Sequence, residues 1–93
     1  MKKHMLKIYP EFFEAVLSGD KPFEVRDNFR RDFQKGDQVC LIEFDPYLPL
    51  VVGPNDGQSG RSIVADISYV TGFEQKEGYV VIGLKNIRAG ATT

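Results

Sequence analysis

One short segment of the chain carries most of the side chains that could do chemistry. Along the strand-like stretch that follows Gly19, a lysine, a glutamate, an arginine and an asparagine succeed one another as Lys21, Glu24, Arg26 and Asn28. If this polar face lines a cleft, its cations can bind phosphate or carbonyl oxygens, and its carboxylate and amide can bind base amino and imino groups. The set therefore suits a nucleobase or nucleotide.

A solvated strand face is the simpler interpretation of the same residues. Glu24 and Arg26 would then form an ordinary surface pair two residues apart, and such pairs contribute little to stability. The pattern alone favours this interpretation. A ligand site requires that the fold turn this face inward.

More basic and aromatic side chains flank the segment. Arg30 and Arg31 follow on the next loop and are candidates for phosphate contacts, although residues 19–37 contain equal numbers of acidic and basic side chains. Tyr47 and Tyr79 are candidate stacking platforms for a base, because a tyrosine in a loop or at a strand start can keep one ring face in solvent. Phe12, Phe13 and Phe23 are expected in the core rather than as stacking platforms.

Charge and residue inventory exclude several classes of function. Twelve Lys and Arg against thirteen Asp and Glu give a net charge of −1, so we expect weak binding to duplex DNA at most. His4 and Cys40 are the only histidine and cysteine, and no P-loop or GxGxxG is present, so we expect no metal and no cofactor. No apolar run is long enough for a membrane span, and we expect a cytoplasmic monomer.

The elements that position these residues are short. Apolar periodicity predicts strands near residues 4–8, 21–28, 38–45, 61–70 and 79–84, and a helix from Pro10 that ends at Ser18-Gly19. We expect an α+β, mainly β fold: a five-stranded, partly closed barrel with one short helix after the first strand. The expected helix contacts are Phe13, Val16 and Leu17, and the expected core residues are Ile8, Phe23, Val25, Leu41, Ile67 and Ile82.

We expect one domain over residues 1–93, with its core at about 4–85. Prolines, glycines and Asn55-Asp56-Gly57 predict a long loop at 46–59, and the last residues, 88–93, have little to anchor them. A protein-interaction module, in which this loop rather than the polar face contacts a partner, is an alternative interpretation of the chain.

The order of motifs resembles a known family. Gly19-x-Lys21-x-x-Glu24-x-Arg26 resembles the GxKxxExR signature of ASCH domains, which are small PUA-like β-barrels. Further matching pieces are His4-x-Leu6-Lys7-Ile8, Pro10-Glu11-Phe12-Phe13, Phe33-x-x-Gly36-Asp37, Gly60-Arg61 and Gly78 to Leu84. Together they resemble the small bacterial and phage branch catalogued as a domain of unknown function.

The resemblance implies a PUA-like pseudobarrel whose cleft, between the helix and the strand that begins at Lys21, binds RNA or a modified nucleoside. Some ASCH relatives are amidohydrolases that deacylate acetylated cytidine with a lysine, a threonine three residues later and a distant glutamate. Lys21 matches the lysine, but Glu24 stands at the threonine position, and a carboxylate does not replace a hydroxyl nucleophile. The distant glutamate could be Glu74 or Glu77. A small hydrolase that uses Lys21 and Glu24 is thus the alternative to a binding module.

Overall fold

Five strands and one helix make up the part of the chain that the computed structural model describes, residues 1–45 and 58–90. Their order agrees with the expected strand, helix and four further strands. The elements are β1 (Lys3–Ile8), α1 (Pro10–Ser18), β2 (Phe23–Asp27), β3 (Gln38–Phe44), β4 (Gln58–Thr71) and β5 (Tyr79–Ala89).

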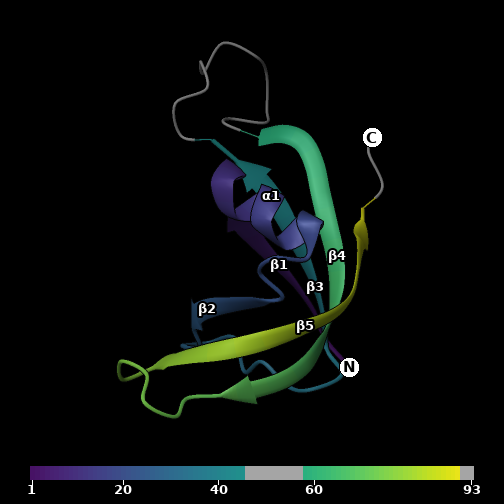
Figure 1. Cartoon of the computed structure of the whole chain (residues 1–93). Coiled ribbons are helices and arrows are strands. Elements are labelled where there is room, and N and C mark those ends of the chain that lie inside the picture. Colours follow the sequence, from purple (N-terminus) through teal and green to yellow (C-terminus); the bar gives the residue numbers. More distant parts are fainter. Residues whose placement is uncertain (46–57, 91–93) are drawn as a thin grey trace.

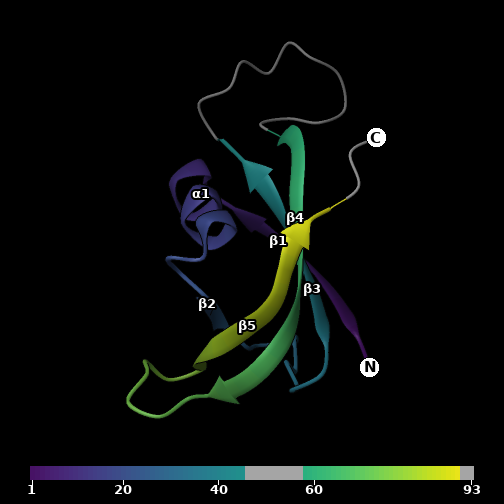
Figure 2. The same cartoon turned by 45° about the vertical axis from the view of Figure 1, so that its right-hand side comes forward.

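The described strands form one mixed sheet in the order β1-β3-β4-β5-β2. β1 pairs with β3 in parallel, and every other neighbouring pair is antiparallel. The sheet curls into a half-barrel, with the long strands β4 and β5 crossing it and α1 lying over its concave side (Figures 1 and 2). The predicted fold class is therefore confirmed, and β1 and β2 are the two edges of the sheet.

The helix begins and ends where the sequence predicts. Pro10 occupies the first turn, where its missing N–H is not needed, and Gly19 takes the left-handed conformation with φ 89° while its N–H donates to Val16 O. Phe13 and Val16 are buried against the sheet. Leu17 is 40% exposed, contrary to expectation, because a helix of about two turns covers the sheet with only a narrow strip.

The core lies between α1 and the concave face of the sheet. Every second residue of β1 is buried, as the alternation predicts, and the centres of β3 and β4 supply the most deeply buried side chains. The core members are Leu6, Ile8, Phe13, Val16, Phe33, Val39, Leu41, Ile63, Ala65, Ile67, Ile82 and Leu84.

Strand β2 shows the opposite face to the one expected. Phe23 and Val25, expected in the core, are 39% and 45% exposed, whereas Glu24 is only 4% exposed. A period of two predicts that the faces alternate, but it does not say which face turns inward. Here the curl of the sheet turns the Glu24 face toward the concave side, where neighbouring cations compensate its charge.

The two longest strands exceed their expected lengths. β4 begins at Gln58, inside the expected loop, and β5 continues to Ala89, where it pairs with Ile63, so the expected loose tail is wrong for its first two residues. Tyr69, expected to share a face with Ile67, is 64% exposed because the β4–β5 register shifts between them. The remainder of the expected loop, with Tyr47, and the last three residues of the tail lie outside the described residues.

A pair of valines tests the assignment of the β2 faces. Val39 is fully buried in β3 and Val25 is nearly half exposed in β2, so Val39→Ala is expected to lower the free energy of unfolding by about 2 kcal/mol and Val25→Ala by well under half of that. Urea denaturation of both variants measures the difference. Equal losses would show that the outer face of β2 is covered.

Candidate functional site

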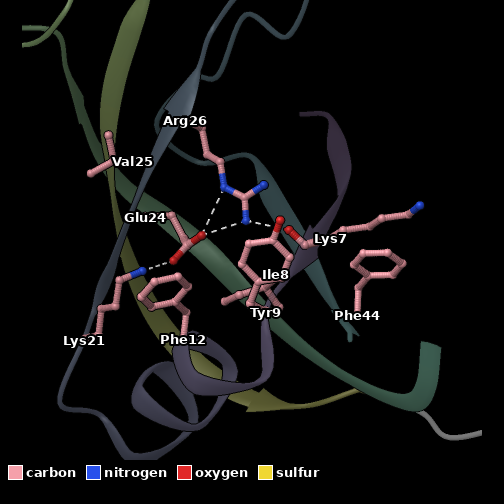
Figure 3. A pocket seen from close by; sticks show the side chains of 9 residues that line it. All are labelled: Lys7, Ile8, Tyr9, Phe12, Lys21, Glu24, Val25, Arg26 and Phe44. Carbon is pink, nitrogen blue, oxygen red and sulfur yellow. Dashed lines mark hydrogen bonds and ion pairs between the residues drawn. The ribbon is translucent and has the colours of Figure 1, made fainter. Parts of the chain in front are cut away.

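A pocket of about 510 Å³ lies where the two edges of the half-barrel approach each other beside the start of α1. One wall comes from the end of β1 and the residues that lead into the helix, the other from β2 and the segment before it, and the end of β3 closes one side (Figure 3). The lining residues are Lys7, Ile8, Tyr9, Phe12, Lys21, Glu24, Val25, Arg26 and Phe44.

Glu24 is the polar centre of this pocket. Its Oε1 accepts hydrogen bonds from Nε and Nη2 of Arg26 at 3.0 and 2.7 Å, and its Oε2 accepts one from the ammonium of Lys21. A buried carboxylate is costly unless it is both paired and hydrogen-bonded, and these two cations supply both conditions. Two positive charges thus stand beside one negative charge.

Arg26 also joins the two edges of the sheet. Its Nη2 donates to the backbone oxygen of Lys7 at 2.7 Å, across the gap between β2 and β1. These strands are at opposite ends of the sheet order, so no ladder hydrogen bonds hold them to each other. One side chain, itself fixed by Glu24, therefore links the two walls of the pocket (Figure 3).

Three aromatic rings form a row along the pocket, which we call the aromatic row: Phe12, Tyr9 and Phe44. The Tyr9 ring centroid lies 6.5 Å from that of Phe12 and 6.4 Å from that of Phe44. A lysine ammonium stands at each end, Lys21 at 5.2 Å from the Phe12 centroid and Lys7 at 4.8 Å from the Phe44 centroid. Tyr9 and Phe12 are 52% and 42% exposed, so their rings are accessible to a planar ligand.

The chemistry of the pocket is that of hydrogen-bond donors beside aromatic surfaces. Its lining carries three cations and one carboxylate, on a chain whose net charge is −1. Glu24 already accepts from both neighbours, so a ligand meets mainly the N–H groups of Arg26, Lys21 and Lys7. The arrangement suits a flat ligand with acceptor or anionic groups.

The structure brings together three of the predicted site residues, Lys21, Glu24 and Arg26. Because Glu24 is buried, the interpretation of this motif as a solvated strand face is wrong. The face of β2 that turns inward is not the one expected in the core, and this inward face contributes Glu24 and Arg26 to the site.

The other predicted site residues do not line this pocket. The side chain of Asn28 accepts from the Phe33 N–H at 3.0 Å and shapes the following turn. Arg31 is exposed, and Arg30 lies over the ring of Phe29 beyond the end of β2. Tyr79 pairs with Asp27 at that same end and has the Lys76 ammonium over its ring.

Besides the aliphatic Ile8 and Val25, four lining residues were not singled out for the site from the sequence: Lys7, Tyr9, Phe12 and Phe44. Phe12 was expected in the core together with Phe13. Adjacent residues of a helix point in different directions, so Phe13 is buried and Phe12 lines the pocket. One available signal was an unexplained aromatic residue directly before Pro10, at the junction of a strand and a helix. Phe44 reaches the site through the parallel pairing of β3 with β1, which no local pattern indicates.

A second charged cluster ties α1 to the sheet. Arg61 on β4 donates from Nε and Nη2 to the two Glu43 oxygens at 3.0 and 2.9 Å, forms an ion pair with Glu14 of α1, and lies over the Phe13 ring. The Arg61 hydrogen bonds hold the pKa of the Glu43 carboxyl below its usual value. Since these groups satisfy one another, the cluster is structural.

A third cluster fixes the start of β1. His4 Nε2 lies 2.9 Å from Asp37 Oδ2, and Asp37 also accepts from the backbone N–H groups of Lys2 and Gln34. These hydrogen bonds lower the pKa of Asp37 to about 2, the Lys2 N–H contributing most. Cys40 is buried and free, and the described residues contain no group of ligands that could hold a metal ion.

The Asp37 cluster predicts how stability changes in acid. Because the pKa of Asp37 lies at about 2 in the folded chain, below its ordinary value of 3.8, the unfolded chain binds this proton more tightly. The stabilisation is complete above about pH 4 and is lost as the pH falls toward about 2. Between these limits the melting temperature is expected to fall less steeply with decreasing pH for Asp37→Asn than for the wild type. The exposed Asp32→Asn should follow the wild type. An unchanged acid slope in Asp37→Asn would assign the acid sensitivity to another carboxylate.

Removal of the Glu24 charge tests whether this carboxylate anchors the pocket. Glu24→Gln keeps the shape but leaves Lys21 and Arg26 without a counter-charge, so we expect a loss of about 1 to 3 kcal/mol in the free energy of unfolding. Glu77→Gln, at an exposed position, is the matched control and should leave stability nearly unchanged. A Glu24→Gln protein as stable as this control would mean that the ion pairs contribute nothing to the fold.

No helix within the described residues is long and apolar enough to cross a membrane.

Comparison with known proteins gives a family for the chain. A search of curated proteins finds no significant match. A family described as a domain of unknown function (DUF3850) matches residues 3–84, which include every lining residue of the pocket. The chain belongs to this DUF3850 family.

Proposed function

We propose that the chain is a binding module whose pocket takes a nucleotide-like ligand, either free or as part of RNA. The observation that carries this proposal is the accessible aromatic row beside donors held by a buried carboxylate. A planar base can stack on Tyr9 and Phe12 while its acceptor atoms meet Arg26 and Lys21.

The burial of Glu24 supports a role for the pocket beyond stability. A buried charge on an edge strand carries a desolvation cost that an apolar residue does not. Well-placed ion pairs and hydrogen bonds must offset this cost. What the charge provides is a fixed orientation of two cations beside aromatic rings. Groups held in place before a ligand arrives bind it with less loss of conformational freedom.

Arg26 is the side chain best placed to read the ligand. Its Nε and Nη2 are used by Glu24 and by the Lys7 carbonyl, whereas its Nη1 has no hydrogen-bond partner among the described residues. A planar guanidinium locked on one side offers its remaining N–H groups in a defined direction. We assign Arg26 to a carbonyl or phosphate oxygen of the ligand.

The alternative is a small hydrolase for a modified nucleoside, with Glu24 as general base through a water molecule. The geometry favours binding over hydrolysis, because both Glu24 oxygens already accept hydrogen bonds from cations. A carboxylate engaged in this way stabilises charge rather than removing protons.

The resemblance to ASCH and PUA-like domains supports the same proposal. That resemblance implies a cleft between the helix and the strand after Lys21, and the pocket lies between these elements. The acidic balance of the chain and the size of the pocket favour a single base over a duplex. We therefore expect weak duplex DNA binding with a shallow salt dependence, on the order of two or three phosphate contacts.

Replacement of one tyrosine tests the proposal. Tyr9→Ala should weaken binding of short single-stranded RNA or of nucleotides by about tenfold or more, because base stacking is worth about 1 to 3 kcal/mol per base. Tyr69→Ala is the matched control, since Tyr69 is also exposed, at 64% against 52% for Tyr9, but lies outside the pocket lining. Fluorescence anisotropy with labelled RNA and calorimetry with nucleotides measure the affinities.

Two results would contradict the proposal. Equal affinities for the two tyrosine variants would place binding elsewhere on the molecule. Release of a product from a panel of acylated nucleosides, detected by mass spectrometry and lost in Tyr9→Ala, would identify the hydrolase instead.

A further inference from the structure

The three cations of the pocket are not equivalent. Lys21 and Arg26 share the carboxylate of Glu24, and Lys21 lies in addition between the rings of Phe12 and Phe23. Lys7 forms no ion pair with any described residue. Its ammonium lies over the face of the Phe44 ring, 4.8 Å from the ring centroid.

Lys7 therefore carries positive charge that the pocket itself does not neutralise. A cation over a ring gains modest stabilisation and keeps its donors directed to solvent, since the ring engages no N–H group in a conventional hydrogen bond. The backbone of Lys7 is held by Arg26, so the residue that bears this charge is fixed to the wall of the pocket. Such a group is available for an anion.

The position of Lys7 relative to the aromatic row indicates where that anion lies. Lys7 and Phe44 stand at one end of the row, and Lys21 and Phe12 at the other, with Tyr9 between them (Figure 3). A base stacked at the Phe12 end places its sugar near the middle of the row. A phosphate on that sugar then points toward the Phe44 end.

We propose that Lys7 over Phe44 is a phosphate subsite, and that through it the pocket selects a phosphorylated nucleotide over the corresponding nucleoside. This inference rests on the proposed function, because it divides the ligand into a stacked base and an anionic group. A free nucleoside monophosphate and a phosphodiester unit of single-stranded RNA share the required chemistry.

The experiment compares each of the four ribonucleosides with its 5′- and 3′-monophosphates by calorimetry, on wild type and on two lysine variants. Lys7→Ala removes the proposed subsite. Lys3→Ala is the control, because Lys3 is also exposed on β1 and its loss changes the net charge equally, but it does not line the pocket.

We expect wild type and Lys3→Ala to bind at least one monophosphate about tenfold more tightly than its nucleoside, as one charge-assisted hydrogen bond provides. In Lys7→Ala this preference should shrink to about threefold or less, because the affinity lost is mainly that for the monophosphate. Lys7→Arg should restore most of the preference, because it restores the positive charge. If the lysine stem acted only by packing, the preference would not depend on this charge.

The outcomes separate the subsite from the function of the pocket. Nucleosides that bind as tightly as their monophosphates, or a phosphate preference that survives Lys7→Ala, would overturn the subsite while the stacking pocket stands. Failure of every nucleoside, monophosphate and short oligonucleotide to bind wild type would overturn both. If one of the two monophosphates, 5′ or 3′, binds more tightly than the other, the ligand is a free nucleotide. If both bind equally well and a short single-stranded oligonucleotide binds more tightly than either, the ligand is RNA.

Discussion

The burial of one carboxylate, Glu24, is the constraint on which the rest of this structure depends. A buried negative charge must be neutralised, and Lys21 and Arg26 do so from the same short segment of chain. The inward turn of Glu24 forces its strand neighbours Phe23 and Val25 outward, so an edge strand that could have added to the core becomes the wall of a pocket. The arginine fixed in this way then reaches the opposite edge of the sheet at Lys7.

The topology explains why the pocket is made of residues far apart in the sequence. β1 lies beside β3 in parallel, while β2 leaves α1 and joins the opposite edge of the sheet beside β5. The curl of the sheet brings these edges back toward each other, with the start of α1 between them (Figure 1). Aromatic rings from β3, from the helix and from the residue between β1 and α1 meet there. The cations come from both edges.

Local patterns sufficed for much of the fold but only part of the site. Alternation placed His4, Leu6 and Ile8 on the inner face of β1, and proline and glycine marked both ends of α1, because these signals act within a few residues. Spacing also grouped Lys21 with Glu24 and Arg26, as neighbours on one strand. The orientation of β2 and the approach of Phe44 depend on the curl and pairing of the whole sheet, so the sequence pattern did not contain them. Arg30 was predicted for the site because it is close in sequence, but it follows the end of β2, lies over the Phe29 ring and does not line the pocket.

The parallel pairing of β1 with β3 has a kinetic consequence. Lys3 pairs with Gln38, 35 positions along the chain, whereas the β4–β5 pairing closes through a short turn. Contacts of long sequence separation carry the greater loop-closure entropy, which orders the assembly of the sheet. The antiparallel centre is expected to form first, and the β1 edge, with Lys7 and the Arg26 link, to join after the rate-limiting barrier. A ligand held between the two edges would then act on a late structure. It would prolong the lifetime of the folded chain by slowing unfolding, while the folding rate stays almost the same.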